Sequence, residues 1–538
     1  MINSPEQIFS EYEKQRSYKA SIGTRGIYEQ SKINERFFVG DQWYGAKCGN
    51  ERPLVRHNLI KRIGDYKMSM LLSDNTEITY TAEGVADTVM TEKSVKEIRK
   101  TLAEGKKAAF TDEKQEIATV MSALNDYQRT TAERLKLQSL LEQALRNAYI
   151  SGTGVVYTYW EPEENTGLYA DDFGSVAIKG DIKCEVIDIE NVYFGDPNVS
   201  DVQSQPYIIL ASSRPVAELK RYAARFGAGY SEINNIKADS SLSGENVTVL
   251  TKLFKEWDSA AKEYKIYAKM VTSGATVREK WDIGVRLYPL CTFSWERGKN
   301  SPYGESEITY LIPNQIAVNR MITAGVWSAM STGMPTLVVN GDVVEGNITN
   351  DPGQIIKVFG TAEEIAGALK YVTPPDYSGN IQSVVAPLIE NTLSQSGANP
   401  AALGDVDPQN TSAILALRNA AALPLKMLQS RYHGFLEEIS RVWAEFWIMQ
   451  YGKRSLKISD ENGVWYMDFN GEKYRELVIR ATAFVSADDT YTADMRVKVL
   501  DNLLSRGEIT AEQYLKRLPR GLVSGCDELI REIKGELQ

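Results

Sequence analysis

The sequence predicts an α+β fold in which helices and antiparallel strands occupy separate stretches of the chain. Apolar residues recur at three- and four-residue steps before residue 150 and again after residue 305, which is the helical period. Between these stretches, short β-branched and aromatic runs alternate with Gly, Asn, Asp and Ser, as in antiparallel sheets. The 538 residues exceed what one hydrophobic core usually organises, so we expect two to four structural regions.

The first half of the chain divides into a helical part and a sheet part. Residues 1–150 are predicted to be mainly helical, with the clearest apolar stripe over 114–150. Ser151-Gly152-Thr153-Gly154 ends this stripe, and antiparallel strands are expected after it. The predicted strands are 155–160, 184–189, 207–211, 249–257, 264–271 and 287–295.

The second half returns to helices interrupted by two small β-rich segments. A helical piece ends at Ile312 before Pro313, and a second run continues through Ser331. One long helix over 411–451 is expected to be kinked at Pro424, with the apolar stripe Leu428, Tyr432, Phe435, Ile439, Val442 and Phe446. The other expected elements are strands at 336–340, 354–359, 456–469 and 477–484, a helix over 381–394, a Gly/Pro/Asp loop at 397–408 and three amphipathic helices from about 492.

Composition excludes several classes of protein. Hydrophobic residues are 43% and charged residues 25%, which excludes a disordered chain, a collagen-like fibre and a polytopic membrane protein. Residues 321–341 are uncharged, but Ser and Thr interrupt them and Gly333-Met334-Pro335 would break a helix, so we expect no membrane span. The N-terminus lacks a signal-peptide pattern. The 4 cysteines form no CxxC pair, which fits a reducing cytoplasm without a disulfide framework.

Motifs for catalysis or cofactor binding are missing from the sequence. It contains no GxxxxGK[ST] phosphate loop, no GxSxG and no HExxH, and 2 histidines leave little for a metal site. Gly152-Thr153-Gly154 lacks the third glycine of a dinucleotide motif and precedes a strand instead of a helix. Neighbouring carboxylates such as Asp488-Asp489 are typical of a protein surface. We therefore expect no enzyme activity, no catalytic residue, no cofactor and no metal.

Negative charge is concentrated between residues 301 and 411. Eleven acids and three bases give this segment a charge of −8, most of the total of −10. A protein that grips nucleic acid through its phosphates normally carries a basic surface. Any contact of this segment with DNA should therefore be repulsive, and an ordinary solvated acidic surface is the alternative interpretation.

Several strings, in their order, resemble tailed-bacteriophage portal proteins over roughly residues 30–520. They are Arg36–Trp43, Asn58–Leu72 with Thr76–Tyr80, Glu190–Pro197 with Arg214-Pro215 and Glu218–Lys220, and Tyr303–Glu307 with Gln315 and Asn319. The resemblance also rests on the order of a helix, a small β insert, a second helix, a loop and a long aromatic helix. It implies the following division: a wing over 1–304 and 452–490, stem helices over 305–332 and 378–396, a clip over 333–377, a tunnel loop over 397–410, a long wing helix over 411–451 and a short helical crown over 491–538.

The resemblance implies a virion protein that forms a ring of about twelve subunits around a channel at one capsid vertex. Double-stranded DNA would pass through the channel without sequence specificity during genome packaging and ejection. Implied partners are the terminase large subunit, the major capsid protein, scaffold, and head-completion adaptor or tail proteins, with assembly in the host cytoplasm and no membrane. Twelve copies of the acidic segment would place about 96 negative charges near the axis, which would keep DNA centred and mobile.

The resemblance also implies roles for particular residues. The tunnel loop would present Gly397, Asn399, Pro400, Gly404, Asp405 and Asp407 to DNA; the stem would present Asn314, Gln315, Asn319 and Thr323 to the channel; and the clip would present Asp342, Glu345, Asp351, Glu363 and Glu364 to terminase or adaptor. The sequence departs from many relatives in having stem helices poor in charge and a short crown.

Two other functions remain open at this point. One is another oligomeric phage component, such as a scaffold-binding protein or a different part of the head–tail connector. The other is a cytoplasmic enzyme of mixed fold, which would need a cleft of convergent carboxylates. A ring with a central hole in negative-stain images would favour the portal, and a compact monomer would favour the enzyme.

Overall fold

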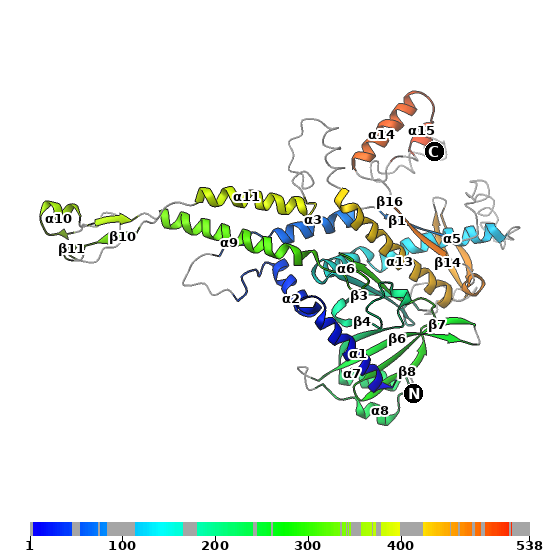
Figure 1. Cartoon of the computed structure of the whole chain (residues 1–538). Helices are drawn as coiled ribbons and strands as arrows, with labels where there is room; N and C mark the ends of the chain where they lie inside the picture. Colours follow the sequence, from blue (N-terminus) through cyan, green and yellow to red (C-terminus); the bar gives the residue numbers. More distant parts are fainter. Residues whose placement is uncertain are drawn as a thin grey trace.

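The computed structural model describes most of the chain. The described residues are 4–45, 54–73, 76–82, 113–164, 180–239, 245–259, 262–333, 336–340, 342, 344–345, 357–367, 369–372, 378–398, 423–451, 453–460, 463–475, 479–485, 490–515 and 518. The fold is α+β, as predicted. Figure 1 shows a body of helices and sheets from which two long helices project and end in a small β-rich tip.

Helices form the first part of the body. They are α1 (Pro5–Ser21), α2 (Gly26–Val39), α3 (Leu59–Ser73), α5 (Glu113–Arg134) and α6 (Leu137–Ser151), with strand β1 (Thr76–Ala82) between α3 and α5. Ser4 caps α1, its hydroxyl accepting a hydrogen bond from the backbone of Gln7. Gly152 ends α6 with φ +88°, and a Cβ there would lie 2.3 Å from the Gly304 carbonyl oxygen. Only glycine fits this junction between α6 and the following strand.

Two antiparallel sheets follow, as predicted. Strands β2 (Thr153–Glu161), β3 (Asp181–Asp188) and β9 (Leu290–Ser294) form one sheet in the order β3-β2-β9. The second has the order β4-β5-β6-β7-β8, with β4 (Val192–Phe194), β5 (Tyr207–Pro215), β6 (Asn246–Asp258), β7 (Glu263–Thr272) and β8 (Ala275–Asp282). Helices α7 (Val216–Arg225) and α8 (Tyr230–Asn235) pack beside β8. β8 was not predicted, because Arg278, Glu279 and Lys280 interrupt its apolar alternation.

We call α9 (Glu307–Gly333) and α11 (Ser378–Gln395) the helical arm. The predicted break at Pro313 is wrong, because α9 continues through this proline. The whole helix has 27 residues and is about 40 Å long. The two helices lie side by side: the Asn314 side chain donates to Thr392 Oγ1 at 3.2 Å, and Gly325 lies against Ile381. The arm tip contains β10 (Thr336–Val339) paired with β13 (Leu369–Val372), β11 (Val344–Glu345) paired with β12 (Lys357–Val358), and α10 (Ala362–Ala366).

The predicted long aromatic helix is α13 (Lys426–Gln450), about 37 Å over its 25 residues. Pro424 lies in the short 3-10 helix η3 (Leu423–Leu425) directly before α13, and the kink predicted there stays a prediction, because the chain on its N-terminal side lies outside the described residues. Residues 411–422 of the predicted helix lie outside the described residues. The predicted apolar stripe is buried, and Trp443 and Trp447 lie beside it at 0% exposure.

The C-terminal part returns to the body before two last helices. Strands β14 (Lys453–Asp460) and β15 (Gly463–Asn470) form a hairpin, η4 (Gly471–Tyr474) follows, and β16 (Ile479–Val485) pairs antiparallel with β1. The β1–β16 pair joins segments about four hundred residues apart, so one body contains both predicted wing segments. Helices α14 (Thr490–Ser505) and α15 (Ala511–Leu515) are two of the three predicted helices, and the third lies outside the described residues.

One large hydrophobic core connects the body with the start of the arm. It contains residues of α3, α5, α6, β9, α13 and the first turns of α9, including Ile308, Leu311 and Val318. Tyr127 and Tyr451 donate hydrogen bonds to the fully buried Asp181, at 2.7 and 2.8 Å, and Arg134 lies 3.1 Å from the same carboxylate. Burial raises the pKa of Tyr127 above its usual range. The base of the arm therefore shares one hydrophobic core with the body.

Candidate functional site

The first turn of α9 is tied to the body by a buried ion pair. Lys67 on α3 lies 2.6 Å from Glu307, and Trp295 donates its indole N–H to the other Glu307 oxygen at 3.0 Å. The Ser306 hydroxyl donates to the Tyr149 carbonyl at 2.5 Å. Three segments of the body thus fix the direction in which the arm leaves it.

A row of polar side chains on α9 binds the extended segment that precedes α3, and we call this row the polar ladder. Thr323 accepts from the backbone N–H of Val55 at 3.1 Å, Asn319 from His57 at 3.0 Å, and Gln315 from Leu59 at 2.9 Å. Four helical residues rise about 6 Å, and two extended residues rise about 6.6 Å. Every fourth side chain of α9 therefore meets every second backbone N–H of this segment.

The polar ladder corrects the prediction for three of the four stem residues. Gln315, Asn319 and Thr323 are buried at 1%, 2% and 4% exposure, so their side chains face the body and not a channel. Buried amides and hydroxyls need hydrogen-bond partners, and the segment before α3 supplies them. The fourth residue, Asn314, is half-buried and faces α11 through its bond to Thr392.

The predicted clip acids lie at the arm tip where the structure describes them. Asp342, Glu363 and Glu364 are exposed there; the strand position of Glu345 is described but its side chain is not, and Asp351 lies outside the described residues. The exposed apolar side chains Val338, Phe359 and Ile365 accompany them. A hydrogen bond from the Thr361 backbone lowers the pKa of Glu364. Lys357 and Lys370 are exposed there as well, so the tip combines charges of both signs with apolar surface.

Of the predicted tunnel-loop residues, the structure describes Gly397 alone. It follows α11 with φ +78°, in the left-handed region that favours glycine, and it is buried against Pro424. Its burial corrects the prediction that Gly397 faces DNA. Asn399, Pro400, Gly404, Asp405 and Asp407 lie outside the described residues.

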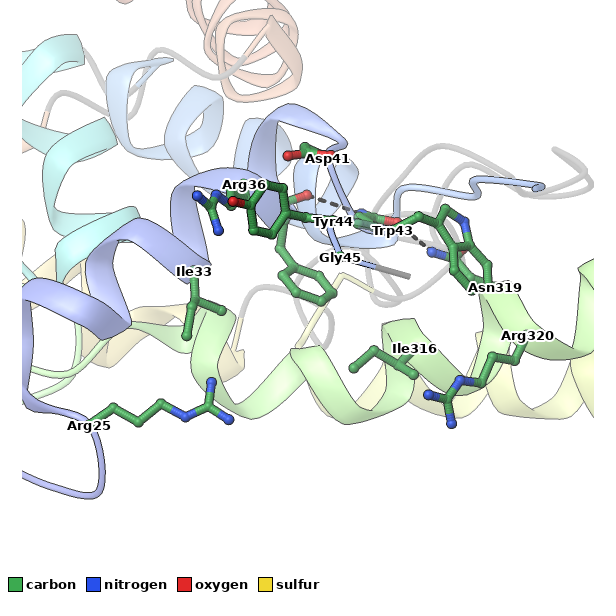
Figure 2. Close-up of a pocket in the computed structure, with 12 residues that line it drawn as sticks. Arg25, Ile33, Arg36, Asp41, Trp43, Tyr44, Gly45, Ile316, Asn319 and Arg320 are labelled. Atoms are coloured by element: carbon green, nitrogen blue, oxygen red, sulfur yellow. Dashed lines mark hydrogen bonds between the residues drawn. The ribbon is translucent and has the colours of Figure 1, made fainter. Parts of the chain in front are cut away.

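A cavity of about 390 Å³ opens between α2 and α9, and we call it the arginine cavity. Its lining includes Arg25, Arg36 and Arg320 but a single acid, Asp41. The Arg36 guanidinium lies 3.6 Å from the centre of the Tyr44 ring. Figure 2 shows Arg25 and Arg320 extending toward each other on either side of Ile316. Charge counting over the sequence did not indicate this cavity, because its arginines come from positions nearly three hundred residues apart.

A larger groove of about 1190 Å³ lies between α5, α6 and α13. Acids and bases alternate along it, with Asp126, Glu133 and Glu142 beside Arg129 and Lys136. Within the described residues, no three His, Cys, Asp or Glu side chains are grouped so that they could hold a metal ion. In the same part of the chain, every helix is too short or too polar to cross a bilayer.

The fold thus defines a class of protein, an α+β body with a projecting two-helix arm. Among solved structures, two chains from gene transfer agent particles are weakly similar to it. No protein-family model and no curated protein matches the chain. A chain from the neck of an empty gene transfer agent particle, computed with C6 symmetry, is 10% identical over 94% of this chain and 93% of its own, with a TM-score of 0.36. A chain from the virion of a native gene transfer agent particle is 9% identical over 94% and 99%, with a TM-score of 0.35. Because both TM-scores are low, neither likeness carries an argument about function.

Proposed function

We propose that this chain is the portal protein of a tailed bacteriophage, located in the virion. About twelve copies form a ring at one capsid vertex, and their arms together line the channel through which double-stranded DNA is packaged and ejected. The protein acts as a conduit and has no enzyme activity of its own. The arm tips bind the terminase large subunit during packaging and adaptor or tail proteins afterwards, and the body contacts the major capsid protein and scaffold.

The observation that carries the proposal is the helical arm. A pair of antiparallel helices, α9 and α11, leaves a packed α+β body and ends in a separate small β-rich tip. The base of the arm shares the core of the body, through Ile308, Leu311 and Val318, while the rest of the arm extends beyond it. The order of these elements agrees with the order that the sequence resemblance implies for stem, clip and stem.

Charge on the arm supports passage of DNA without retention. Among the described arm residues, Arg320 is the one exposed base on α9 and α11, while the tip carries the exposed acids Asp342, Glu363 and Glu364 and the exposed bases Lys357 and Lys370. Phosphate neutralisation by Lys and Arg is what holds proteins on DNA, and each such contact adds to the salt dependence of binding. A surface with few bases lets a duplex slide.

Imaging and mass determination of the purified chain test the proposal. Native mass spectrometry should show a cyclic oligomer of about twelve copies, and negative-stain images should show rings with a central hole. A gel shift should find weak binding of duplex DNA without sequence preference, weaker still as salt rises.

The outcomes separate the proposed function from its alternatives. A monomer or dimer across the micromolar range would refute the ring. Nanomolar, sequence-specific DNA binding at physiological salt would refute the conduit. A closed ring that packages no DNA when supplied with its terminase and procapsid would favour a different part of the head–tail connector.

A further inference from the structure

Each helix of the arm carries one exposed charge. On α9, Glu307 is paired with Lys67, and Arg320 is the remaining charged residue. On α11, Glu390 is the sole charged residue in the helix. Both Arg320 and Glu390 are exposed, and neither forms an ion pair within the part of the chain that the structure describes. Both charges are therefore available to a group on another molecule.

Two contacts define the register between the antiparallel helices α9 and α11. Asn314 contacts Thr392, and Gly325 lies against Ile381. Gly325 is eleven residues after Asn314, and Ile381 is eleven residues before Thr392. Both contacts give the same register, so Glu390 lies at the level of Ile316 along the arm. The buried residues Val385, Thr392 and Leu393 mark the covered side of α11, and Glu390 lies on the exposed side.

Ile316 lines the arginine cavity. Arg25 and Arg320 extend on either side of it (Figure 2). The cavity is lined by Arg25, which precedes α2, by α2 and the residues that follow it, and by α9, without any residue of α11. None of the three arginines is paired with a carboxylate among the described residues. The arm therefore carries a positive cavity on its α9 side and a single carboxylate, at the same level, on α11.

We propose that Glu390 of one copy enters the arginine cavity of the next copy and forms an ion pair with Arg320 and Arg25. This inference rests on the proposed ring. The copies of a ring are related by rotation about its axis, and this rotation does not move a residue along the axis. Glu390 of one copy therefore lies at the same level as Ile316 of the neighbouring copy. The contact joins two different surfaces of the same chain, and such head-to-tail contacts close into rings. Guanidinium groups bind carboxylates through paired, charge-assisted hydrogen bonds.

Charge reversal of the pair tests the contact. Glu390→Arg and Arg320→Glu should each raise the protein concentration at which rings dissociate by about tenfold, because like charges then face each other across every interface. The double variant Glu390→Arg/Arg320→Glu should recover most of the loss. Ring dissociation is followed by native mass spectrometry on a dilution series at low and high salt, and the difference between wild type and variants should shrink as salt rises.

Matched controls come from the other end of the chain. Arg506→Glu and Glu508→Arg reverse exposed charges after α14 and should leave ring dissociation unchanged. Glu390→Gln, which removes the charge without repulsion, should give a smaller effect than Glu390→Arg. Circular dichroism of each variant confirms that the subunit is folded.

The outcomes separate this inference from the proposed function. A wild-type chain that forms no ring overturns the proposed function and the ion pair with it. A wild-type ring whose dissociation is the same in both reversal variants overturns the ion pair alone. Single variants that weaken the ring without recovery in the double variant show that the two residues act separately, which also overturns the pairing.

Discussion

Asn319 is the central rung of the polar ladder, and replacing it with leucine tests whether the ladder attaches the arm to the body. Its Oδ1 accepts from the His57 backbone N–H at 3.0 Å, and its Nδ2 donates to Gln42 Oε1 at 2.5 Å. Leucine has the same number of side-chain heavy atoms in the same branched arrangement, so the change removes hydrogen bonds without opening a cavity. The position is 2% exposed, and water cannot replace the lost partners there.

The size of the effect follows from the groups left behind. Asn319→Leu leaves the His57 N–H and the Gln42 amide oxygen without their partner. An orphaned buried polar group costs about 1–3 kcal/mol, so the loss of partners for two such groups should lower the free energy of unfolding by about 2–6 kcal/mol. Urea unfolding followed by tryptophan fluorescence measures this loss, and hydrogen exchange should show faster exchange of the amides of residues 55–59.

A matched change on the same arm provides the control. Asn391→Leu replaces an exposed asparagine of α11 and should change the free energy of unfolding by no more than about 0.5 kcal/mol. If Asn319→Leu and Asn391→Leu unfold at the same urea concentration, with unchanged exchange at 55–59, the ladder does not hold the arm and the reasoning is refuted.

Three further predictions concern buried groups. Glu307→Gln should lower the free energy of unfolding by about 3–5 kcal/mol in urea titrations, since it leaves the Lys67 charge buried and unpaired, whereas Glu307→Leu with Lys67→Met should cost much less. Burial raises the pKa of the Cys291 thiol well above its usual value, so iodoacetamide should label it slowly at about pH 8 until urea unfolds the chain, and rapid labelling of folded protein would contradict this. Burial lowers the pKa of Lys19 well below its usual value, so the unfolded chain binds a proton there that the folded chain does not. The free energy of unfolding should therefore rise with pH between the pKa of Lys19 in the folded chain and its pKa in the unfolded chain. If Lys19→Met shows the same dependence of unfolding free energy on pH, Lys19 does not cause it.

Periodicity predicted most of the elements because it reports which face of each element is buried. The stripe Leu428, Tyr432, Phe435 and Ile439 was recognised because core residues of a helix must recur every three or four positions. β8 was missed because the charges at 278–280 lie on its exposed half, where they interrupt the pattern. Pro313 was read as a helix end because proline usually removes a hydrogen bond inside a helix, yet the packing of α9 against α11 and the body outweighs that cost.

Pairings between distant segments could not be predicted from one sequence. β1 and β16 are each ordinary short strands, and nothing local to either indicates that Tyr80 and Ala481 lie opposite one another. The arginine cavity has the same origin, since Arg25 and Arg320 meet only because α2 packs on α9. Counting charge by segment placed Arg320 among three bases outnumbered by acids, which concealed that it lies beside two other arginines.

The polar residues of α9 show how the same sequence signal supports opposite interpretations. Gln315, Asn319 and Thr323 recur every four residues on a helix with few charges, and a polar stripe usually faces water. The stripe instead faces a second polar surface, the backbone of an extended segment, whose N–H groups need acceptors when they are covered by a helix. The spacing distinguishes a buried polar stripe from a solvated one. Amides and hydroxyls at i, i+4 and i+8 match alternate N–H groups of an extended chain. A solvated stripe needs no fixed spacing and usually includes charged residues. Because the ladder directs these residues into the body, any surface that α9 offers to a neighbour or to DNA must lie on the side that carries Arg320.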